Sequence, residues 1–335
     1  MTQPLLAQEL AALGLDLGNT LREDPRFLTD GAFLGALHLE LRERLGEGDA
    51  RAALLQLGFL HGLRDALELL TRGLHGGPSG ARATRSRPRV ALVLERVPQT
   101  AGGALRGAFR DGVEARALAS ALGAQAAPSC AVSCGYASGW LSGLFDADLL
   151  AREHGCAAAG HARCEFEARS RDGWEADGAA REDLARLPFS PLRDLVARHL
   201  AAQADAPDDG ERDSFERGAP VIHVWGPVMV IPFSGADETI AGLDLIRRDA
   251  GARDVCVVVL DLAGAIIDES FGALALERVL EAIERLGAEP ILTGISPLSE
   301  RAVADLESTH LVVRKDLPEA IAAAFQIASS LQRPA

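Results

Sequence analysis

Apolar residues recur at helical spacing through the first part of the chain. Between Phe33 and Leu45, and again between Leu54 and Leu70, leucines and other apolar residues return every three or four positions. This period places the apolar side chains on one face of a helix. The pattern predicts that residues 4–74 form a small helical bundle.

The pattern changes after residue 74. Residues 75–88 are rich in glycine, serine and arginine and predict a loop. The alternating residues 89–95 predict a strand that begins a mixed α/β part. Residues 104–122 are expected to form a helix that leads into a cysteine-rich region.

Prolines and polar residues mark a second boundary. Pro188, Pro191 and residues 205–211 flank the helical pattern of residues 192–202, so residues 178–218 predict a connector with one helix. This helix could transmit a change in packing or could be a spacer.

The C-terminal part reads as a small sheet covered by helices. Residues 221–232 predict a hairpin and residues 255–260 a buried strand. Residues 271–286 are amphipathic, and residues 318–331 predict a closing helix. The expected fold is therefore a two-domain α+β and α/β protein. It has an N-terminal helical subdomain, a mixed α/β domain, and then a small sheet with helices.

Composition narrows the class of protein. The 335 residues suffice for two domains, and 48% hydrophobic and 24% charged residues are typical of a globular protein. A net charge of −14 argues against a nucleic-acid partner, which needs clustered Lys and Arg. No apolar run approaches eighteen residues and no signal sequence is evident, so we expect a cytoplasmic protein with no membrane partner. The odd number of cysteines, five, fits a reducing compartment.

Candidate metal chemistry lies within a stretch of thirty-five residues. Its metal-binding side chains, spaced as C-x22-E-x2-C-x7-C, belong to Cys130, Glu153, Cys156 and Cys164. Three thiolates and a carboxylate suit a tetrahedral Zn²⁺, and four protein ligands leave no position for a catalytic water. The spacing favours a structural zinc site. The alternative is that these cysteines are small core residues, as Cys134 and Cys256 are expected to be.

The motifs around these side chains resemble a known family. A cysteine precedes a G-Y-x-x-G motif by five residues, and E-x-x-C and G-x-x-x-C motifs follow. The matching residues are Cys130, Gly135, Tyr136, Gly139, Glu153, Cys156, Gly160 and Cys164. The segment resembles the vinyl-reductase-type sensor domain of aromatic-responsive sigma-54 activators. The resemblance implies that the three cysteines and the glutamate bind zinc, and that the helical N-terminal part helps the sensor to dimerise.

The same resemblance implies a pocket for a small hydrophobic or aromatic molecule. Its expected ligand-binding residues are Phe109, Cys134 and Tyr136. Phenol-reading members of the family have Trp where this chain has Phe109. The difference favours an apolar ligand, because a buried hydroxyl needs a hydrogen-bond partner. The alternative is a structural domain without a ligand, with Cys134 and Tyr136 in its core.

The C-terminal part carries a second resemblance. Its matching stretches are residues 226–232, 260–264, 268–270 and 286–297. Residues 220–331 resemble the STAS domain (sulphate transporter and anti-sigma factor antagonist) in the form found in stressosome co-antagonists. The resemblance implies that a Ser or Thr directly after the motif aspartate, Asp268, is phosphorylated and controls binding of a protein partner.

The chain departs from this pattern, because Glu269 follows Asp268. Three interpretations stay open. Glu269 could mimic the phosphorylated state by its charge, or Ser270 or Thr293 could be the phosphate acceptor. In the third, Asp268 and Glu269 simply cap a helix.

Together these observations predict four parts. Residues 1–75 would form a helical dimerisation subdomain, 76–177 a zinc sensor domain, 178–218 a helical connector and 219–332 a STAS domain. We expect a non-enzymatic signalling regulator, since no G-x-x-x-x-G-K-[ST] loop or basic recognition helix is present. Its partners would be a small ligand and a STAS-binding protein, either a kinase or other STAS proteins.

A homodimer or a larger assembly is expected. One alternative is a stressosome-like scaffold subunit that senses no ligand. Less favoured is a zinc or reductase-related enzyme.

Overall fold

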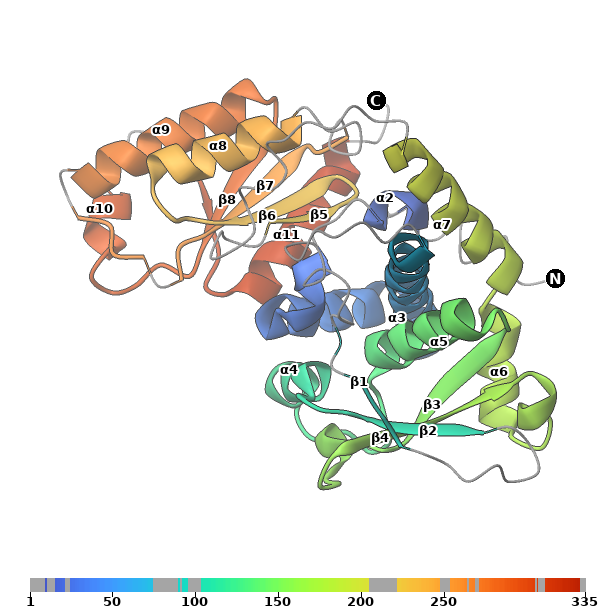
Figure 1. The fold of residues 1–335 in the computed structure, drawn as a ribbon. Coiled ribbons are helices and arrows are strands. Elements are labelled where there is room, and N and C mark those ends of the chain that lie inside the picture. Colours follow the sequence, from blue (N-terminus) through green and yellow to red (C-terminus); the bar gives the residue numbers. More distant parts are fainter. Residues whose placement is uncertain are drawn as a thin grey trace. The chain divides into compact units, whose positions relative to one another are not determined.

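The computed structural model (Figure 1) describes residues 10, 16–21, 25–74, 90, 92–95, 104–204, 222–247, 254–263, 265–268, 271–304, 306 and 311–331. These residues divide into two compact units. The first unit comprises the described residues between 25 and 204. The second comprises those from 222 onward, together with the N-terminal stretch that contains α2 (Leu17–Thr20).

The first unit begins with helices, as the sequence predicted. The 3-10 helix η1 (Pro25–Thr29) leads into α3 (Gly31–Leu74), which is kinked at Gly46, where φ is 76°. The apolar positions of α3 are buried, among them Phe33, Leu34, Leu37, Leu54, Leu55, Leu60 and Leu63. The loop predicted for residues 75–88 lies outside the described residues.

Helix α3 crosses α5 (Ala131–Phe145) at very short range, because glycines occupy both sides of the crossing. Gly58 and Gly62 lie one turn apart on α3, and Gly135 and Gly139 lie one turn apart on α5. A Cβ atom at Gly139 would lie 2.7 Å from the backbone nitrogen of Leu63. Backbone therefore touches backbone, and such close approach permits Cα–H···O contacts between helices.

The first unit also contains a four-stranded antiparallel sheet. Its strands are ordered β1-β2-β4-β3, with β1 at Leu92–Glu95, β2 at Leu105–Phe109, β4 at Cys164–Ser170 and β3 at Leu149–Gly155. Helix α4 (Val113–Leu122) follows β2.

The prediction of a helix over residues 104–122 is wrong for its first part. Residues 105–109 pair with β4 instead, and Gly112, at φ 50°, turns the chain into α4. Gly107 explains the difference, because a Cβ there would lie 2.7 Å from the carbonyl oxygen of Val93. A glycine at this position weakens a helix and allows close strand packing.

Two helices, rather than the one predicted, follow the sheet. These are α6 (Gly178–Arg186) and α7 (Phe189–Ala204). Both belong to the first unit. Asp183 of α6 accepts two hydrogen bonds from Arg51 of α3, at 3.0 and 2.9 Å, and the ring of Phe189 meets Phe59 edge-on at 5.4 Å. Helix α6 was missed because its sequence is mostly polar and short, with little apolar period.

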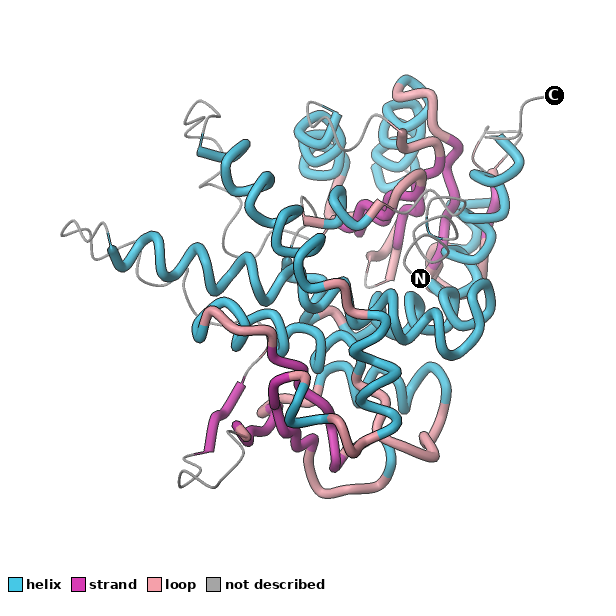
Figure 2. Tube along the Cα trace, turned by 90° about the vertical axis from the view of Figure 1, so that its right-hand side faces the viewer, coloured by secondary structure: helices cyan, strands magenta, loops and turns pink. Residues whose placement is uncertain are grey.

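The second unit is a five-stranded sheet with helices packed on it (Figures 1 and 2). In sheet order the strands are β5 (His223–Trp225), β6 (Val228–Pro232), β7 (Val257–Asp261), β8 (Glu289–Thr293) and β9 (Val312–Val313). Strands β5 and β6 form the predicted antiparallel hairpin, and the other neighbouring pairs are parallel.

Helices account for the buried strands of this unit. Helices α8 (Ala236–Arg247) and α9 (Phe271–Arg285) pack against each other, and α10 (Glu300–Ala304) packs on α9. Helix α11 (Leu317–Leu331) packs against β6, β7 and β8. Residues 257–260 of β7 are accordingly all buried, as expected for a parallel strand covered on both faces. Among the described residues, no helix is both long and apolar enough to cross a membrane.

The glycine crossing gives a direct test. Gly62→Ala should lower the free energy of unfolding by about 2–3 kcal/mol, because overpacking outweighs the better helix propensity of alanine. Gly31→Ala is the control, since a Cβ there meets only ordinary contacts, 3.9 Å and beyond. Thermal unfolding should show a fall of several degrees for Gly62→Ala only. Equal melting of both variants would contradict the close crossing.

Candidate metal centre and adjacent pocket

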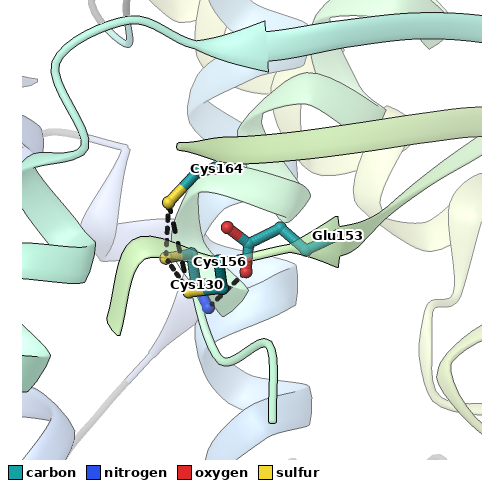
Figure 3. A group of neighbouring side chains, drawn as sticks. All are labelled: Cys130, Glu153, Cys156 and Cys164. Atoms are coloured by element: carbon teal, nitrogen blue, oxygen red, sulfur yellow. Dashed lines mark hydrogen bonds between the residues drawn. The ribbon is translucent and has the colours of Figure 1, made fainter. Parts of the chain in front are cut away.

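Four side chains predicted to bind a metal come together in the first unit (Figure 3). Cys130 is the N-cap residue of α5, Glu153 lies on β3, and Cys164 begins β4. Cys156 directly follows β3 and precedes the 3-10 helix η3 (Ala157–Ala159). The donor atoms all lie within 4.8 Å of one another, so the cluster could hold a metal ion.

The three sulfur atoms form a triangle of nearly equal sides. Cys130 Sγ lies 3.6 Å from Cys156 Sγ and 4.0 Å from Cys164 Sγ, and the last two are 4.0 Å apart. A disulfide needs about 2.05 Å, so none of these cysteines is paired covalently. Three thiolates held tetrahedrally at about 2.3 Å from one ion would be about 3.8 Å apart. The triangle therefore has the size that a shared ion requires.

The carboxylate of Glu153 completes the cluster. Its Oε2 atom accepts a hydrogen bond from the backbone nitrogen of Cys130 at 3.1 Å. Its Oε1 atom is buried and has no hydrogen-bond partner among the described residues. A buried carboxylate oxygen without a partner is costly, and a bound cation would satisfy it.

The four acidic groups perturb one another. Burial, with the neighbouring Cys156 as the next cause, raises the pKa of Glu153 to about 8. The pKa of Cys156 is lowered because Cys130 and Cys164 hydrogen-bond to its sulfur, and the pKa of Cys130 is raised by its bonds to the same partners. Without a cation, these groups cannot all ionise together. A bound metal would deprotonate them.

Backbone groups shape the cluster further. The backbone nitrogen of Ala157 donates to Cys164 Sγ at 3.3 Å, and His161 Nδ1 lies 3.1 Å from the carbonyl oxygen of Cys156. Gly160, at φ 86°, closes the turn after η3. His154 is 55% exposed and faces Glu165 rather than the cluster. Both histidines are thus outside the donor set, in agreement with the structural roles expected for them.

A small pocket lies in the same unit. Its volume is about 30 Å³, and it is lined by Leu28, Thr29, Val90, Phe109, Asp111, Gly112, Val113, Glu114 and Ser133. Phe109, one of the three predicted ligand-binding residues, lines it and stacks on Phe166 with 4.8 Å between ring centroids.

The other two predicted ligand-binding residues do not line this pocket. Tyr136 is fully buried, and its hydroxyl donates to Asp65 at 2.7 Å. Cys134 is 1% exposed, and burial raises the pKa of its thiol well above the usual value. The alternative interpretation, in which both are core residues, describes their positions here.

Sequence reasoning missed Glu114, whose side chain is only 2% exposed. Its carboxylate accepts hydrogen bonds from the backbone nitrogens of Val132 and Ser133, at 2.9 and 2.7 Å. His38 Nε2 lies 2.8 Å from Glu114 Oε1. The only signal was a carboxylate in the first turn of α4, which is usually solvent-exposed.

The predicted regulatory positions lie in the second unit. Asp268 Oδ1 accepts a hydrogen bond from the backbone nitrogen of Phe271 at 2.9 Å, as the N-cap of α9 would. Glu269 and Ser270 lie outside the described residues. Thr293, at the end of β8, is 0% exposed, and its hydroxyl is buried, which puts it out of reach of a kinase in this state.

Metal binding should depend on pH. Below pH 8 the Glu153 carboxyl of the metal-free protein holds a proton that a metal must displace, so the apparent metal affinity should rise with pH up to about 8. Glu153→Gln should release about one proton fewer per metal bound near pH 7, as measured by calorimetry in buffers of different ionisation enthalpy. Equal proton release by the parent and the variant would rule out Glu153 as a donor.

Comparisons with known proteins agree with the motif analysis. Residues 109–170 match the model of the V-4-R domain, which is the vinyl-reductase-type domain. A solved structure, described as the phenol-responsive sensory domain of the transcription activator PoxR with phenol, is 31% identical, with a TM-score of 0.37. The match covers 47% of this chain and 80% of that one. No curated protein matches. Residues 109–170 of this chain therefore belong to the vinyl-reductase-type domain family.

Proposed function

We propose that this chain is a non-enzymatic signalling protein. The first unit binds a small hydrophobic or aromatic molecule, zinc stabilises that unit, and the second unit passes the signal to a protein partner. The match of residues 109–170 to the vinyl-reductase-type domain carries this proposal, because the matched segment holds both the donor cluster and one wall of the pocket.

The metal proposed is Zn²⁺, with Cys130, Glu153, Cys156 and Cys164 as its ligands. Zinc is borderline-soft and accepts three thiolates with one carboxylate in a tetrahedral shell. Four protein donors fill that shell and leave no position for a water. The bound ion would tie the start of α5 to strands β3 and β4. This supports a structural role and weighs against a zinc enzyme.

A pair of cysteine variants tests the metal centre. The parent should contain about one zinc per chain, and Cys156→Ala should contain almost none and melt roughly 10 °C lower. Cys134→Ala is the matched control, because Cys134 is equally buried on α5 but lies outside the cluster. It should keep its zinc. Zinc content measured by mass spectrometry decides, and parent-like zinc in Cys156→Ala would refute the assignment.

The ligand proposed for the pocket is a single aromatic ring or a molecule of similar size. Leu28, Val113 and Phe109 offer apolar contacts, and Glu114 and Ser133 offer polar ones. The pocket volume of about 30 Å³ is well below the roughly 150 Å³ that accepts benzene in an engineered cavity. Ligand entry would therefore require the pocket to open. Such opening gives a binding event a structural consequence, which a sensor needs.

Small aromatic probes test this site. Phenol or toluene at about 100 times its Kd should stabilise the parent by about 2.7 kcal/mol and raise its melting temperature by several degrees. Val113→Phe should abolish the shift by filling the pocket, and Val113→Ala should retain it. The absence of any shift in the parent, with a panel of aromatic compounds, would favour the scaffold subunit without ligand sensing.

The second unit is proposed as a STAS domain that binds a protein partner. Its parallel sheet, flanking helices and the Asp268 cap at the start of α9 support this reading. Since the described acceptor candidate Thr293 is buried, the proposal keeps two alternatives: Glu269 as a fixed negative charge, or Ser270 as the modified residue. A homodimer or a larger assembly is the proposed state.

A further inference from the structure

The N-terminus of α5 is capped by side chains from other elements. Cys130 occupies the N-cap position, yet its side chain makes no capping hydrogen bond, because the sulfur belongs to the metal cluster. The first amide groups of a helix have no partner within the helix. Here Glu153 accepts from the nitrogen of Cys130, and Glu114 accepts from those of Val132 and Ser133.

Two carboxylates therefore replace the missing cap. Both carry negative charge to the positive end of the helix dipole, where it is stabilising. Glu153 is a proposed metal ligand, whereas Glu114 stands on α4, outside the donor set. Hydrogen bonds to an ionised carboxylate are about twice as strong as those between neutral groups. Glu114 thus fixes the helical turn that carries Cys130.

Glu114 is itself held from behind. His38 of α3 is 1% exposed and lies 2.8 Å from Glu114 Oε1 through its Nε2 atom. The Oε1 atom therefore serves two partners, His38 and the nitrogen of Val132. This contact leaves the carboxylate little freedom to rotate without losing one of its bonds.

Glu114 also forms part of the pocket wall, together with Ser133 and Phe109. One side chain therefore faces both the proposed ligand and the helix end that carries Cys130. A ligand group that hydrogen-bonds to Glu114, or pushes it aside, must weaken its hold on the amides of Val132 and Ser133. These residues follow Cys130 by two and three positions.

We propose that Glu114 is the positioning residue of the metal centre and links it to the pocket. Its carboxylate sets the place of Cys130 in the cluster, so that a pocket occupant that draws on this carboxylate also weakens metal binding. By thermodynamic reciprocity, metal binding would then weaken the binding of that occupant to the same degree. The inference rests on the proposed function for its ligand, but the metal side can be tested with metal alone.

The test compares the full chain with Glu114→Gln, in which an amide NH₂ would face one of the α5 amide groups. Zinc affinity is measured by competition with a chromophoric chelator, and the ligand geometry by the absorption of the Co²⁺-substituted protein. We expect zinc binding 10–100-fold weaker than in the parent, the range for residues that support metal ligands, with a shifted Co²⁺ spectrum. Glu182→Gln, which changes a 63% exposed carboxylate of the same unit, should match the parent.

A role limited to helix stability would lower the melting temperature of Glu114→Gln but leave zinc affinity and the Co²⁺ spectrum unchanged, and this result would overturn the proposal. If Glu114→Gln does not fold, His38→Gln carries the test, because it keeps the carboxylate but removes its support. It should bind zinc several-fold more weakly, and parent-like affinity would overturn the proposal. If the parent itself binds no metal, the proposed zinc site fails first, and the two failures are distinguishable.

Discussion

The glycine-mediated crossing of α3 and α5 is the constraint on which the first unit depends. Contact at backbone distance is possible only because Gly58, Gly62, Gly135 and Gly139 present no side chains there. The opposite side of α5 uses serines. Ser138 Oγ accepts a hydrogen bond from the backbone nitrogen of Ala151 at 2.8 Å, which docks α5 onto β3.

Small residues thus let one helix touch a helix on one side and a strand on the other. Ser142 repeats the strand contact near the end of α5, where its Oγ accepts from the nitrogen of Leu149 at 3.0 Å. Residues 131–143 are accordingly all buried. With α5 fixed along its length, Cys130 at its start has a defined position relative to Glu153 on β3. The metal cluster can then form from elements that are distant in the sequence.

Several features of this unit could be predicted from the sequence, and others could not. The donor set was visible because cysteines are rare and their spacing is specific. The G-Y-x-x-G motif was also visible, but Gly135 and Gly139 act in helix packing, and Tyr136 binds Asp65 in the core rather than a ligand. A motif records which residues a fold requires, but not which neighbour each of them meets.

Glu114 and residues 105–109 show a second limit. Glu114 follows the ordinary pattern of a helix start, and only the tertiary structure shows that its carboxylate serves another helix. The strand at 105–109 was read as helix because the local pattern is ambiguous over five residues. Its pairing with β4, together with the need for a residue without a side chain at position 107, decides the matter. Both depend on contacts between residues far apart in the sequence.

The rigid crossing also determines where a change at the pocket can go. Helix α5 cannot slide along α3, because Gly135 and Gly139 fit only where α3 offers bare backbone. A perturbation of Glu114 therefore cannot be absorbed by a shift of the whole helix. It must be taken up within the first turn of α5, which carries Cys130. A stiff helix with a capped end thus confines the response to the turn that joins the pocket to the metal cluster.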